Sequence, residues 1–519
     1  MAESSDPSES PATHHLEQQR RANRDAVAAL GLKPYGEREE GLEVLGSARA
    51  KWSEQADAAV AAAGKTPPAG WTDPRPVVAI AGRVVLLRDN GKLVWMQVRD
   101  HTGELQIAVS QKDVDETTFK FAKLIDLGDV ITARGRVMKT RTGEVTLWAS
   151  GLRPAGKCLA PPPEKHAGLH DVELRYRQRY VDMWSTPGTT EVFQRRSMIV
   201  SRVREFMNAR GYLEVETPML QVLAGGAAAR PFITHMNALG IPLYLRIAPE
   251  LYLKRLLVGG LPRVYEINRN FRNEGLDKQH NPEFTMLEAY HAFGDVETVM
   301  EMTESLIRDA ARAVAVSSAA GLVLPFGDLQ IDYGAAFRRV AYADLFRAAL
   351  GFDMTDRARV RQEAEARHIK TQNVDHWVLV NHLFEAFAEK SIDPAKPTFI
   401  TDYPAAISPL TRPKPGNPEL ADRADLFIGG MELAPHYTEL NDPDVQEAKF
   451  REQLATGDVE KNAEESTFRT FDADFIQALK VGMPPAGGMG LGIDRLVMLL
   501  TNQRTIRDVV LFPLMRPVE

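Results

Sequence analysis

Charged, amide and aromatic residues gather in the segment Arg269-Asn270-Phe271-Arg272-Asn273-Glu274-Gly275 and again in His280-Asn281-Pro282-Glu283-Phe284-Thr285, with apolar runs on both sides. An arginine such as Arg272 can donate two parallel hydrogen bonds to a carboxylate or a phosphate. A carboxylate such as Glu274 can accept from an exocyclic amine, and the ring of Phe284 can cover a flat base. These residues predict a site for a ligand that is both anionic and aromatic, such as ATP. A solvated turn between two strands is the alternative for a motif of this kind taken alone.

A second segment, Gly487-Gly488-Met489-Gly490-Leu491-Gly492-Ile493-Asp494-Arg495-Leu496, leads glycines directly into an apolar stretch that we expect to be a helix. Glycines let the backbone approach a ligand closely, and a helix N-terminus adds partial positive charge. The segment follows no predicted strand and lacks the full dinucleotide-binding spacing, so the glycines alone could also mark a tightly packed buried helix. Arg495 favours a ligand, because an arginine buried in an apolar helix needs an anionic partner.

Together these segments resemble the second and third sequence motifs of class II aminoacyl-tRNA synthetases, in particular the lysyl-tRNA synthetases of the bacterial type. The resemblance covers residues 75–517, and the first motif is matched by Gly211-Tyr212-Leu213-Glu214-Val215-Glu216-Thr217-Pro218, expected as a helix that ends at Pro218. Residues 225–232 and 245–254 carry strings typical of the lysine enzyme. The His-Ile-Gly-His and Lys-Met-Ser-Lys-Ser strings of the other synthetase class are absent from the sequence.

The resemblance implies an α+β protein: an N-terminal five-stranded OB-fold β-barrel, then a class II catalytic domain with a mostly antiparallel sheet flanked by helices. We expect an N-terminal flexible and helical extension at 1–71, the anticodon-binding barrel at 72–156, a linker at 157–185 and the catalytic domain at 186–519. A helical insertion is expected at about 328–395. In the extension, residues 1–12 have a disordered composition, and 15–30 and 46–63 suggest helices of a solvent-exposed appendage.

The residues themselves support the barrel. Short apolar runs alternate with glycine-containing turns, and one helical stretch near Phe119 interrupts them. Five short strands with one interposed helix fit an OB barrel. The expected strands are 77–85, 93–99, 105–109, 130–137 and 145–148.

OB barrels bind single-stranded nucleic acid by stacking bases on aromatic side chains and reading base edges with polar groups. The resemblance assigns the stacking role to Trp95, where relatives usually have phenylalanine, and the reading of the tRNA(Lys) anticodon to Arg88, Gln106 and Glu144. A core position in its strand is the alternative for Trp95. Residues 72–156 hold 13 Lys and Arg against 10 Asp and Glu, whereas the whole chain carries a net charge of −7. Charge alone is therefore a weak indication of RNA binding.

Composition fits a soluble enzyme of several domains, because 519 residues exceed what one hydrophobic core usually holds. Cys158 is the single cysteine, which excludes an internal disulfide and a cysteine-rich zinc site. The sequence has neither an apolar run of membrane-spanning length nor a signal-peptide pattern. We therefore expect a cytoplasmic protein without membrane attachment.

The resemblance implies activation of L-lysine by attack of its carboxylate on the α-phosphorus of ATP. Cationic groups and metal ions promote such a step by positioning and electrostatics, without a protein nucleophile. Arg272 would bridge the amino-acid carboxylate and the α-phosphate, and Arg495 would hold the γ-phosphate; both are expected to be catalytic. The other expected ATP contacts are Glu274, His280, Asn281 and Phe284.

Magnesium binds hard oxygen ligands shared with the phosphates. By resemblance Glu432 is its principal protein ligand. Asp425 stands where relatives carry a second glutamate, and because its side chain is one methylene shorter, a bridging water is the alternative to direct coordination.

A lysine pocket must hold an ammonium at the end of an apolar stem, so buried carboxylates are expected there. By resemblance Glu250 and the Gly226 backbone would contact the α-amino group, and Glu439 and Tyr290 the ε-ammonium. The full set of expected lysine contacts is Gly226, Glu250, Arg272, Glu288, Tyr290, Tyr437 and Glu439.

Three positions depart from the family pattern: relatives usually have asparagine at Pro435, a small residue at His436 and histidine at Met236. We interpret Met236 as a packing change. Pro435 and His436 leave open a relaxed pocket or a preference for a modified lysine, and we expect lysine itself to remain the substrate.

Other readings are an aspartate or asparagine enzyme, a paralogue that activates a lysine analogue or acylates a protein target, and a non-enzymatic RNA-binding module. An aspartate or asparagine enzyme would need a cation at Glu439, and protein-acylating relatives lack the barrel. The first motif implies a homodimer.

Overall fold

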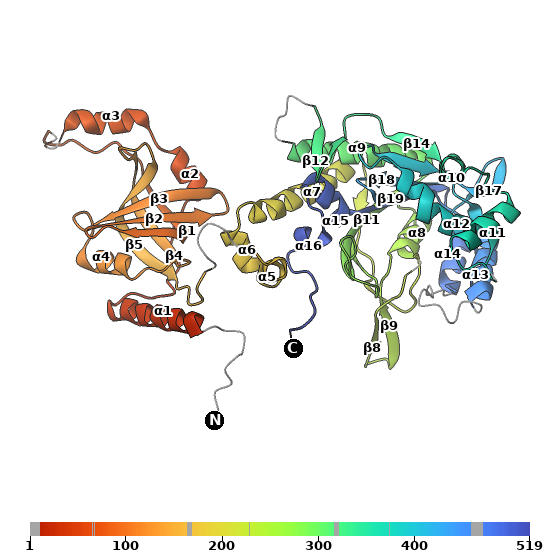
Figure 1. The fold of residues 1–519 in the computed structure, drawn as a ribbon, viewed down its shortest axis with the longest axis horizontal. Helices are drawn as coiled ribbons and strands as arrows, with labels where there is room; N and C mark the ends of the chain where they lie inside the picture. Colours follow the sequence, from red (N-terminus) through yellow and green to blue (C-terminus); the bar gives the residue numbers. More distant parts are fainter. Residues whose placement is uncertain are drawn as a thin grey trace. The chain divides into compact units, whose positions relative to one another are not determined.

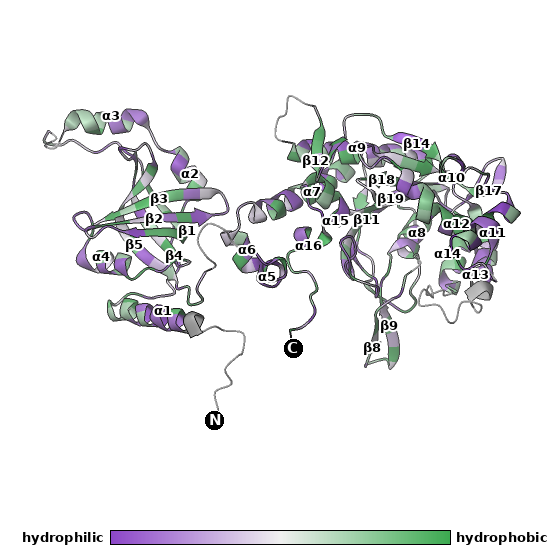
Figure 2. Ribbon diagram, viewed as in Figure 1, coloured by the Kyte–Doolittle hydropathy of each residue, from purple (hydrophilic) through white to green (hydrophobic). Residues whose placement is uncertain are grey.

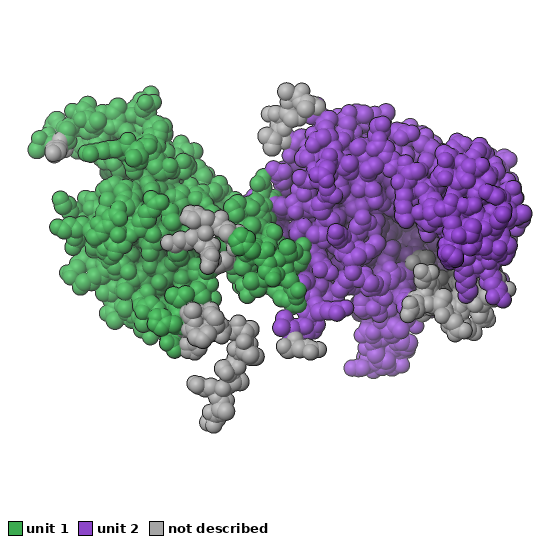
Figure 3. Space-filling model, viewed as in Figure 1, with its two compact units in different colours: residues 1–191 green, residues 192–519 purple. Residues whose placement is uncertain are grey.

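The computed structural model describes residues 11–518, apart from 65, 67, 163–168, 228, 316–320, 373 and 458–470. The chain divides into two compact units, residues 1–191 and 192–519, shown in separate colours in Figure 3. The disorder expected for residues 1–12 falls on undescribed residues except at its end, because helix α1 begins at Pro11. The finer domain limits stay predictions.

The first unit contains a closed five-stranded barrel (Figure 1). Its strand order is β1-β2-β3-β5-β4, and the OB-fold expectation is confirmed. Buried and partly exposed residues alternate along β2, so Val94, Met96 and Val98 fill the interior while the residues between them face outward. Figure 2 shows this alternation of hydrophobic and hydrophilic residues along the barrel strands. The strands and the helix between them are β1 (Val77–Asp89), β2 (Leu93–Asp100), β3 (Gly103–Ser110), α4 (Glu116–Lys123), β4 (Val130–Lys139) and β5 (Val145–Gly156).

Three helices precede the barrel, α1 (Pro11–Ala29), α2 (Leu45–Ala50) and α3 (Glu54–Ala63), and the first two contribute residues to its core. Val27 and Leu45 are buried in the barrel core. The Arg20 guanidinium donates 2.8 Å hydrogen bonds to the carbonyls of Leu127 and Cys158. The helices expected in this extension are present and most of their residues are exposed or half-exposed, whereas a few buried positions anchor α1 and α2 to the barrel. Two short helices follow the barrel, α5 (Val172–Arg177) and α6 (Arg179–Ser185).

The second unit is built on an eight-stranded sheet. Neighbouring strands are antiparallel except for two parallel pairs at the edges, β14 with β15 and β10 with β6, which confirms the expected sheet type. In spatial order the strands are β14 (Arg338–Ala341), β15 (Thr398–Thr401), β18 (Arg423–Ile428), β19 (Met431–Thr438), β20 (Ala486–Gly492), β11 (Glu283–Ala292), β10 (Arg263–Phe271) and β6 (Leu213–Glu214).

The two faces of this sheet differ. One face is apolar and forms the main core with helices α9 (Val296–Val314) and α15 (Ile493–Leu500). Asp295 caps α9 through a capping box with Thr298. The opposite face, called here the site face, carries polar residues from four strands, and it is the face on which the expected catalytic residues lie.

Two expectations about local structure are wrong. Helix α7 (Thr189–Ala209) ends before Gly211, whose φ of +75° favours glycine, so the first motif is not a helix that ends at Pro218. The glycines before Arg495 form strand β20, where the sequence predicted no strand, and they are required because a Cβ at Gly487 would lie 2.4 Å from the Asp295 carbonyl oxygen.

The remaining elements surround the sheet. The expected helical patterns at 341–350 and 360–367 correspond to α10 and α11, which form a separate small core with α12, but the region around 328–341 is β-structure and β14 belongs to the main sheet. These elements are β7 (Leu220–Gln221), β8 (Ile233–Met236), β9 (Ile241–Leu245), α8 (Glu250–Val258), β12 (Val323–Phe326), β13 (Leu329–Asp332), α10 (Tyr342–Leu350), α11 (Arg357–Ala366), α12 (His376–Leu383), β16 (Pro413–Lys414), β17 (Asn417–Ala421), α13 (Pro443–Gly457), α14 (Ala473–Gly482) and α16 (Ile506–Val509). Within the described chain, each helix is too short or too polar to span a bilayer.

Candidate active site

The centre of the site face is a strand without side chains. Gly488 of β20 lies between Tyr290 of β11 and Tyr437 of β19, and the next site-face residue along β20, Gly490, lies beside Glu288. Side chains at these paired positions point to the same side of the sheet. The glycines therefore form a floor between walls made by the tyrosines and Glu288.

Gly488 is required by the carboxylate above it. A Cβ at this position would lie 1.9 Å from Glu439 Oε1 and 2.7 Å from Tyr290 Cε1. Gly226 has a similar role at the other wall, because its φ is +84° and a Cβ there would approach Glu250 Cβ to 3.0 Å. The sequence shows both glycines, but their contacts depend on residues far away in the chain.

Three charged groups meet at one end of this floor. Lys254 of α8 is fully buried, and its Nζ lies 2.6 Å from Glu250 Oε1 and 2.5 Å from Glu439 Oε2. Burial alone would lower the pKa of Lys254, but the two carboxylates raise it above its usual value. Burial raises the pKa of Glu439 to about 7, against the opposing effect of Lys254. Sequence analysis missed Lys254, although it lies one helical turn after Glu250.

Glu288 and Tyr290 form the neighbouring wall. Both are buried, and the Tyr290 hydroxyl donates a 3.4 Å hydrogen bond to Glu288 Oε2. Burial, together with the nearby charge of Glu250, raises the pKa of Glu288 to about 8. Glu288 can therefore hold a proton at neutral pH, and a cation that binds beside it would favour loss of that proton to solvent.

The other end of the site face carries Arg272, which follows β10. Its guanidinium lies 5.1 Å from the centre of the Phe284 ring. Burial lowers the pKa of Arg272, and the charges of Glu274, Glu288 and Glu432 oppose this effect. In the described structure, Arg272 Nε has no hydrogen-bond partner, nor do the side-chain amide atoms of Asn270. Such buried donors and acceptors indicate a polar ligand at this position.

Arg495 joins two distant segments. Its Nη1 donates a 2.6 Å hydrogen bond to the Glu432 carbonyl, and its Nη2 lies 3.0 Å from His280 Nε2. The expectation that Arg495 is buried is wrong, since it is half-exposed. The buried charge is its neighbour Asp494, which accepts a 2.7 Å hydrogen bond from the Thr285 amide and pairs with Arg196 at 2.6 Å. Asp494 thereby anchors α15 so that Arg495 can face the site.

The remaining residues expected to contact ATP lie on the exposed loop after β10. The Glu274 carboxylate accepts a weak 3.4 Å hydrogen bond from the Arg230 amide. Asn281 donates to the Glu283 carbonyl at 2.6 Å, and His280 Nδ1 lies 2.8 Å from Asp277 Oδ2. The structure thus brings His280 to Arg495 and Phe284 to Arg272, whereas Glu274 and Asn281 contact neighbouring backbone.

The two expected metal ligands differ in their surroundings. Asp425 is buried and accepts two hydrogen bonds from Arg423, at 3.1 and 2.6 Å, whereas Glu432 is exposed. Among the described residues, no group of three His, Cys, Asp or Glu side chains is arranged to hold a metal. The oxygen donors suit magnesium, but they can complete its coordination only together with phosphate and water oxygens.

A third carboxylate near this pair was missed. Burial and the charges of Glu432, Glu385 and Asp425 raise the pKa of Glu389 to about 7. It follows a single π-helical turn after α12, which sequence periodicity does not reveal.

The three residues that depart from the family pattern, Pro435, His436 and Met236, lie in different surroundings. Pro435 lies opposite Asp425 on the site face, and a Cβ on Gly490 would lie 3.6 Å from its ring. His436 points to the core, where its Nε2 lies 2.8 Å from Thr303 Oγ1, and burial lowers its pKa to about 4. Met236 is 40% exposed at the end of β8, so its interpretation as a packing change is wrong.

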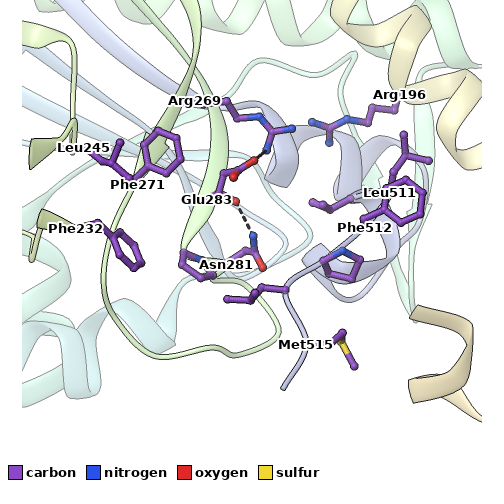
Figure 4. A pocket seen from close by; sticks show the side chains of 14 residues that line it. Arg196, Phe232, Leu245, Arg269, Phe271, Asn281, Glu283, Leu511, Phe512 and Met515 are labelled. Carbon is purple, nitrogen blue, oxygen red and sulfur yellow. Dashed lines mark hydrogen bonds and ion pairs between the residues drawn. The ribbon is translucent and has the colours of Figure 1, made fainter. Parts of the chain in front are cut away.

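A cavity of about 740 Å³ lies on the other side of the β10–β11 hairpin (Figure 4). Arg269 and Phe271 line it, and by strand alternation they point away from Asn270 and the site face. The C-terminal residues 510–515 form its opposite wall. Of the expected site residues, Asn281 alone lines this cavity.

The barrel has its own cluster on the outer face. Trp95 and Trp148 form an edge-to-face pair with ring centres 6.1 Å apart, and Arg88 lies beside Trp95 on the next strand. Gln106 accepts a 2.8 Å hydrogen bond from Thr146 Oγ1, on the same face as the tryptophans. Trp95 is half-exposed, so the core alternative is excluded. Trp148 was missed as a second aromatic platform. Glu144, just before β5, pairs with Arg49 of α2 at 3.2 Å.

Comparisons with known proteins agree with this geometry. Residues 171–516 match the family model described as tRNA synthetases class II (D, K and N), and residues 78–155 match the OB-fold nucleic acid binding domain. A lysine–tRNA ligase of Pelotomaculum thermopropionicum is 48% identical over 86% of this chain and 87% of its own length. Lysine–tRNA ligases of Carboxydothermus hydrogenoformans and Escherichia coli are 47% and 45% identical over 85% of this chain, and over 89% and 87% of their own lengths. The chain belongs to the class II tRNA synthetases of the D, K and N group.

Proposed function

We infer that this chain is a lysine–tRNA ligase: it activates L-lysine with ATP to lysyl-adenylate and transfers the lysyl group to the 3′ end of tRNA(Lys). The observation that carries the inference is the pair of carboxylates, Glu250 and Glu439, that already holds an ammonium group, that of Lys254. Carboxylates that bind one alkylammonium in a buried site can bind another. The names of the relatives agree.

Substrate lysine lies along the glycine floor. Glu439 and Tyr290 contact its ε-ammonium, and Glu250 with the Gly226 backbone contacts its α-amino group. Glu288 and Tyr437 complete the walls. An aspartate or asparagine substrate would need a cation that is free to bind it, whereas Lys254 already lies between two carboxylates.

Activation takes place at the other end of the floor. Arg272 binds both the lysine carboxylate and the α-phosphate, which holds the nucleophile against the phosphorus. Arg495, supported by His280, binds the γ-phosphate of the leaving pyrophosphate. Adenine stacks on Phe284, and Glu274 and Asn281 turn from their backbone contacts towards it.

Magnesium would be held by Glu432, with Asp425 acting directly or through water. When bound, the ion neutralises phosphate charge and aligns the pyrophosphate leaving group. Arg423 orients the Asp425 carboxylate through two hydrogen bonds.

The barrel at 72–156 binds the anticodon, and the catalytic domain at 186–519, with its insertion at about 328–395, performs the chemistry after the linker at 157–185. Trp95 stacks an anticodon base, and Arg88, Gln106 and Glu144 read base edges. The exposed outer face with two tryptophans supports this role.

We also propose a homodimer in the cytoplasm. Exposed apolar side chains follow the first motif, and an apolar surface of this kind is typical of a subunit interface. The residues are Met219, Leu220, Val222 and Leu223, which are 39 to 61% exposed.

The test is lysine-dependent ATP–pyrophosphate exchange, measured across the amino acids and with ornithine and β-lysine, followed by charging of tRNA(Lys). We expect lysine to give the highest kcat/KM. Higher activity with an analogue would instead support the modified-lysine alternative that Pro435 leaves open. Unchanged physiological acylation after removal of residues 1–156 would favour a protein target.

A further inference from the structure

We propose that Lys254 is a positioning and specificity residue: its ammonium favours the ionised form of Glu439 and holds Glu439 and Glu250 at a fixed separation before substrate lysine arrives. This inference rests on the proposed function and deepens it. Lys254 is fully buried and contacts the two carboxylates from within the protein. We therefore place it behind the carboxylates as seen from the substrate, and not in contact with the reacting atoms.

The geometry supports a shared role for the two carboxylates. Lys254 Nζ lies 2.6 Å from Glu250 and 2.5 Å from Glu439, and its side chain has no solvent exposure. Glu250 begins α8 and is one turn before Lys254, whereas Glu439 follows β19, 185 residues further along the chain than Lys254. Lys254 therefore joins the helix that carries one lysine contact to the strand end that carries the other.

The surroundings make this cation necessary. Among the residues that the structure describes, the other titratable groups that face the triad come from β11 and β19, and each is either acidic or a tyrosine. These groups are Glu288, Tyr290 and Tyr437. Without Lys254, a buried Glu439 would gain a proton, because desolvation and the like charge of Glu250 both oppose its ionised form. A protonated Glu439 loses most of its attraction for an ammonium.

Fixed separation also explains selectivity. The Glu439 carboxylate lies directly over Gly488, where a Cβ would be 1.9 Å from Oε1. Lys254 holds its second oxygen, so the carboxylate is held from two sides. A shorter diamino acid such as ornithine then cannot draw the Glu439 carboxylate towards its side-chain ammonium. Loss of Lys254 should free Glu439 to move and allow ornithine to bind.

The experiment compares wild type with Lys254→Met by lysine-dependent ATP–pyrophosphate exchange between pH 6.5 and 9. At pH 7 we expect KM for lysine to rise about 30-fold or more, with KM for ATP within about twofold. The ratio of variant to wild-type KM should fall as pH rises, because Glu439 recovers its charge. The ratio of ornithine to lysine kcat/KM should increase.

A merely structural role predicts a different result. It would give a loss that is independent of pH and equal for lysine and ATP, or a fall in thermal stability with an unchanged lysine KM. Either result overturns the proposal. Lys254→Arg is the conservative control, and restoring the cation should return the pH profile towards wild type even if KM stays elevated.

A second pair of variants tests the proposal in case Lys254→Met alone does not fold. Glu250→Gln keeps the cation beside Glu439, whereas Glu250→Gln with Lys254→Met removes one charge of each sign. The pH-dependent loss should appear in the double variant and not in Glu250→Gln. If neither Lys254→Met variant folds, Lys254 is a folding determinant and the proposal is wrong. Failure of wild type to use lysine would instead refute the proposed function.

Discussion

The barrel and the catalytic sheet place their ligand-binding residues in opposite ways. The barrel fills its interior with apolar side chains and leaves Trp95 and Trp148 on an outer face. All of its strands come from one continuous stretch of about 80 residues. The catalytic sheet buries charges on its site face, and the residues come from positions 226 to 495. The barrel is suited to a long exposed polymer, and the sheet to a small ion that must be enclosed.

This contrast predicts that substitutions of the proposed ligand contacts on the site face impair amino-acid activation, whereas those on the outer face of the barrel weaken only RNA binding. The largest effect is expected for Arg272→Ala, because Arg272 is the residue proposed to hold the lysine carboxylate and the α-phosphate together. We expect a fall of about 1000-fold in kcat/KM for ATP–pyrophosphate exchange. Arg269→Ala is the matched control: its side chain points to the other side of the hairpin and pairs with Glu283, so exchange should stay near wild type.

The second prediction concerns the glycine floor. In Gly488→Ala the new methyl group would occupy the position of the Glu439 carboxylate, and displacement of that group should raise KM for lysine by about 100-fold. Gly490→Ala is the control, because its methyl group would meet the mobile end of Met286 at 3.0 Å. Equal effects in the two variants would show that the strand as a whole, and not the Glu439 contact, is sensitive.

A smaller effect is expected in the barrel. Trp95→Ala should raise KM for tRNA(Lys) about tenfold in the charging assay, because one stacked base is lost. ATP–pyrophosphate exchange, which needs no tRNA, should not change. Trp95→Phe should keep most of the affinity, and a change in exchange with either variant would contradict the separation of the two regions.

The smallest effect is expected for Pro435→Asn. Pro435 lies opposite Asp425, away from the carboxylates that bind the ammonium, so KM for lysine should change by no more than about twofold. A large gain in discrimination between lysine and β-lysine would show that Pro435 does set specificity. His436→Ala would not report on this question, because His436 lies in the core.

The comparison also shows what sequence can predict. The barrel strands were predictable because apolar and polar residues alternate between glycine turns, and this pattern is local. Strand β20 was not, because glycines carry no such pattern. The burial of Lys254 was not predictable, because a lysine one turn after a glutamate usually forms an exposed ion pair on a helix surface. Its burial depends on Glu439, which joins it only after the sheet has formed.

Strand β20 is hydrogen-bonded to β11 on one side and to β19 on the other, so its main chain cannot shift without breaking two ladders. The floor of the proposed lysine site is thus set by the peptide backbone, and a side chain added at Gly488 can only raise it. Trimming Tyr290 or Tyr437 should therefore admit bulkier amino acids by widening the space between the walls, because the floor itself cannot be lowered.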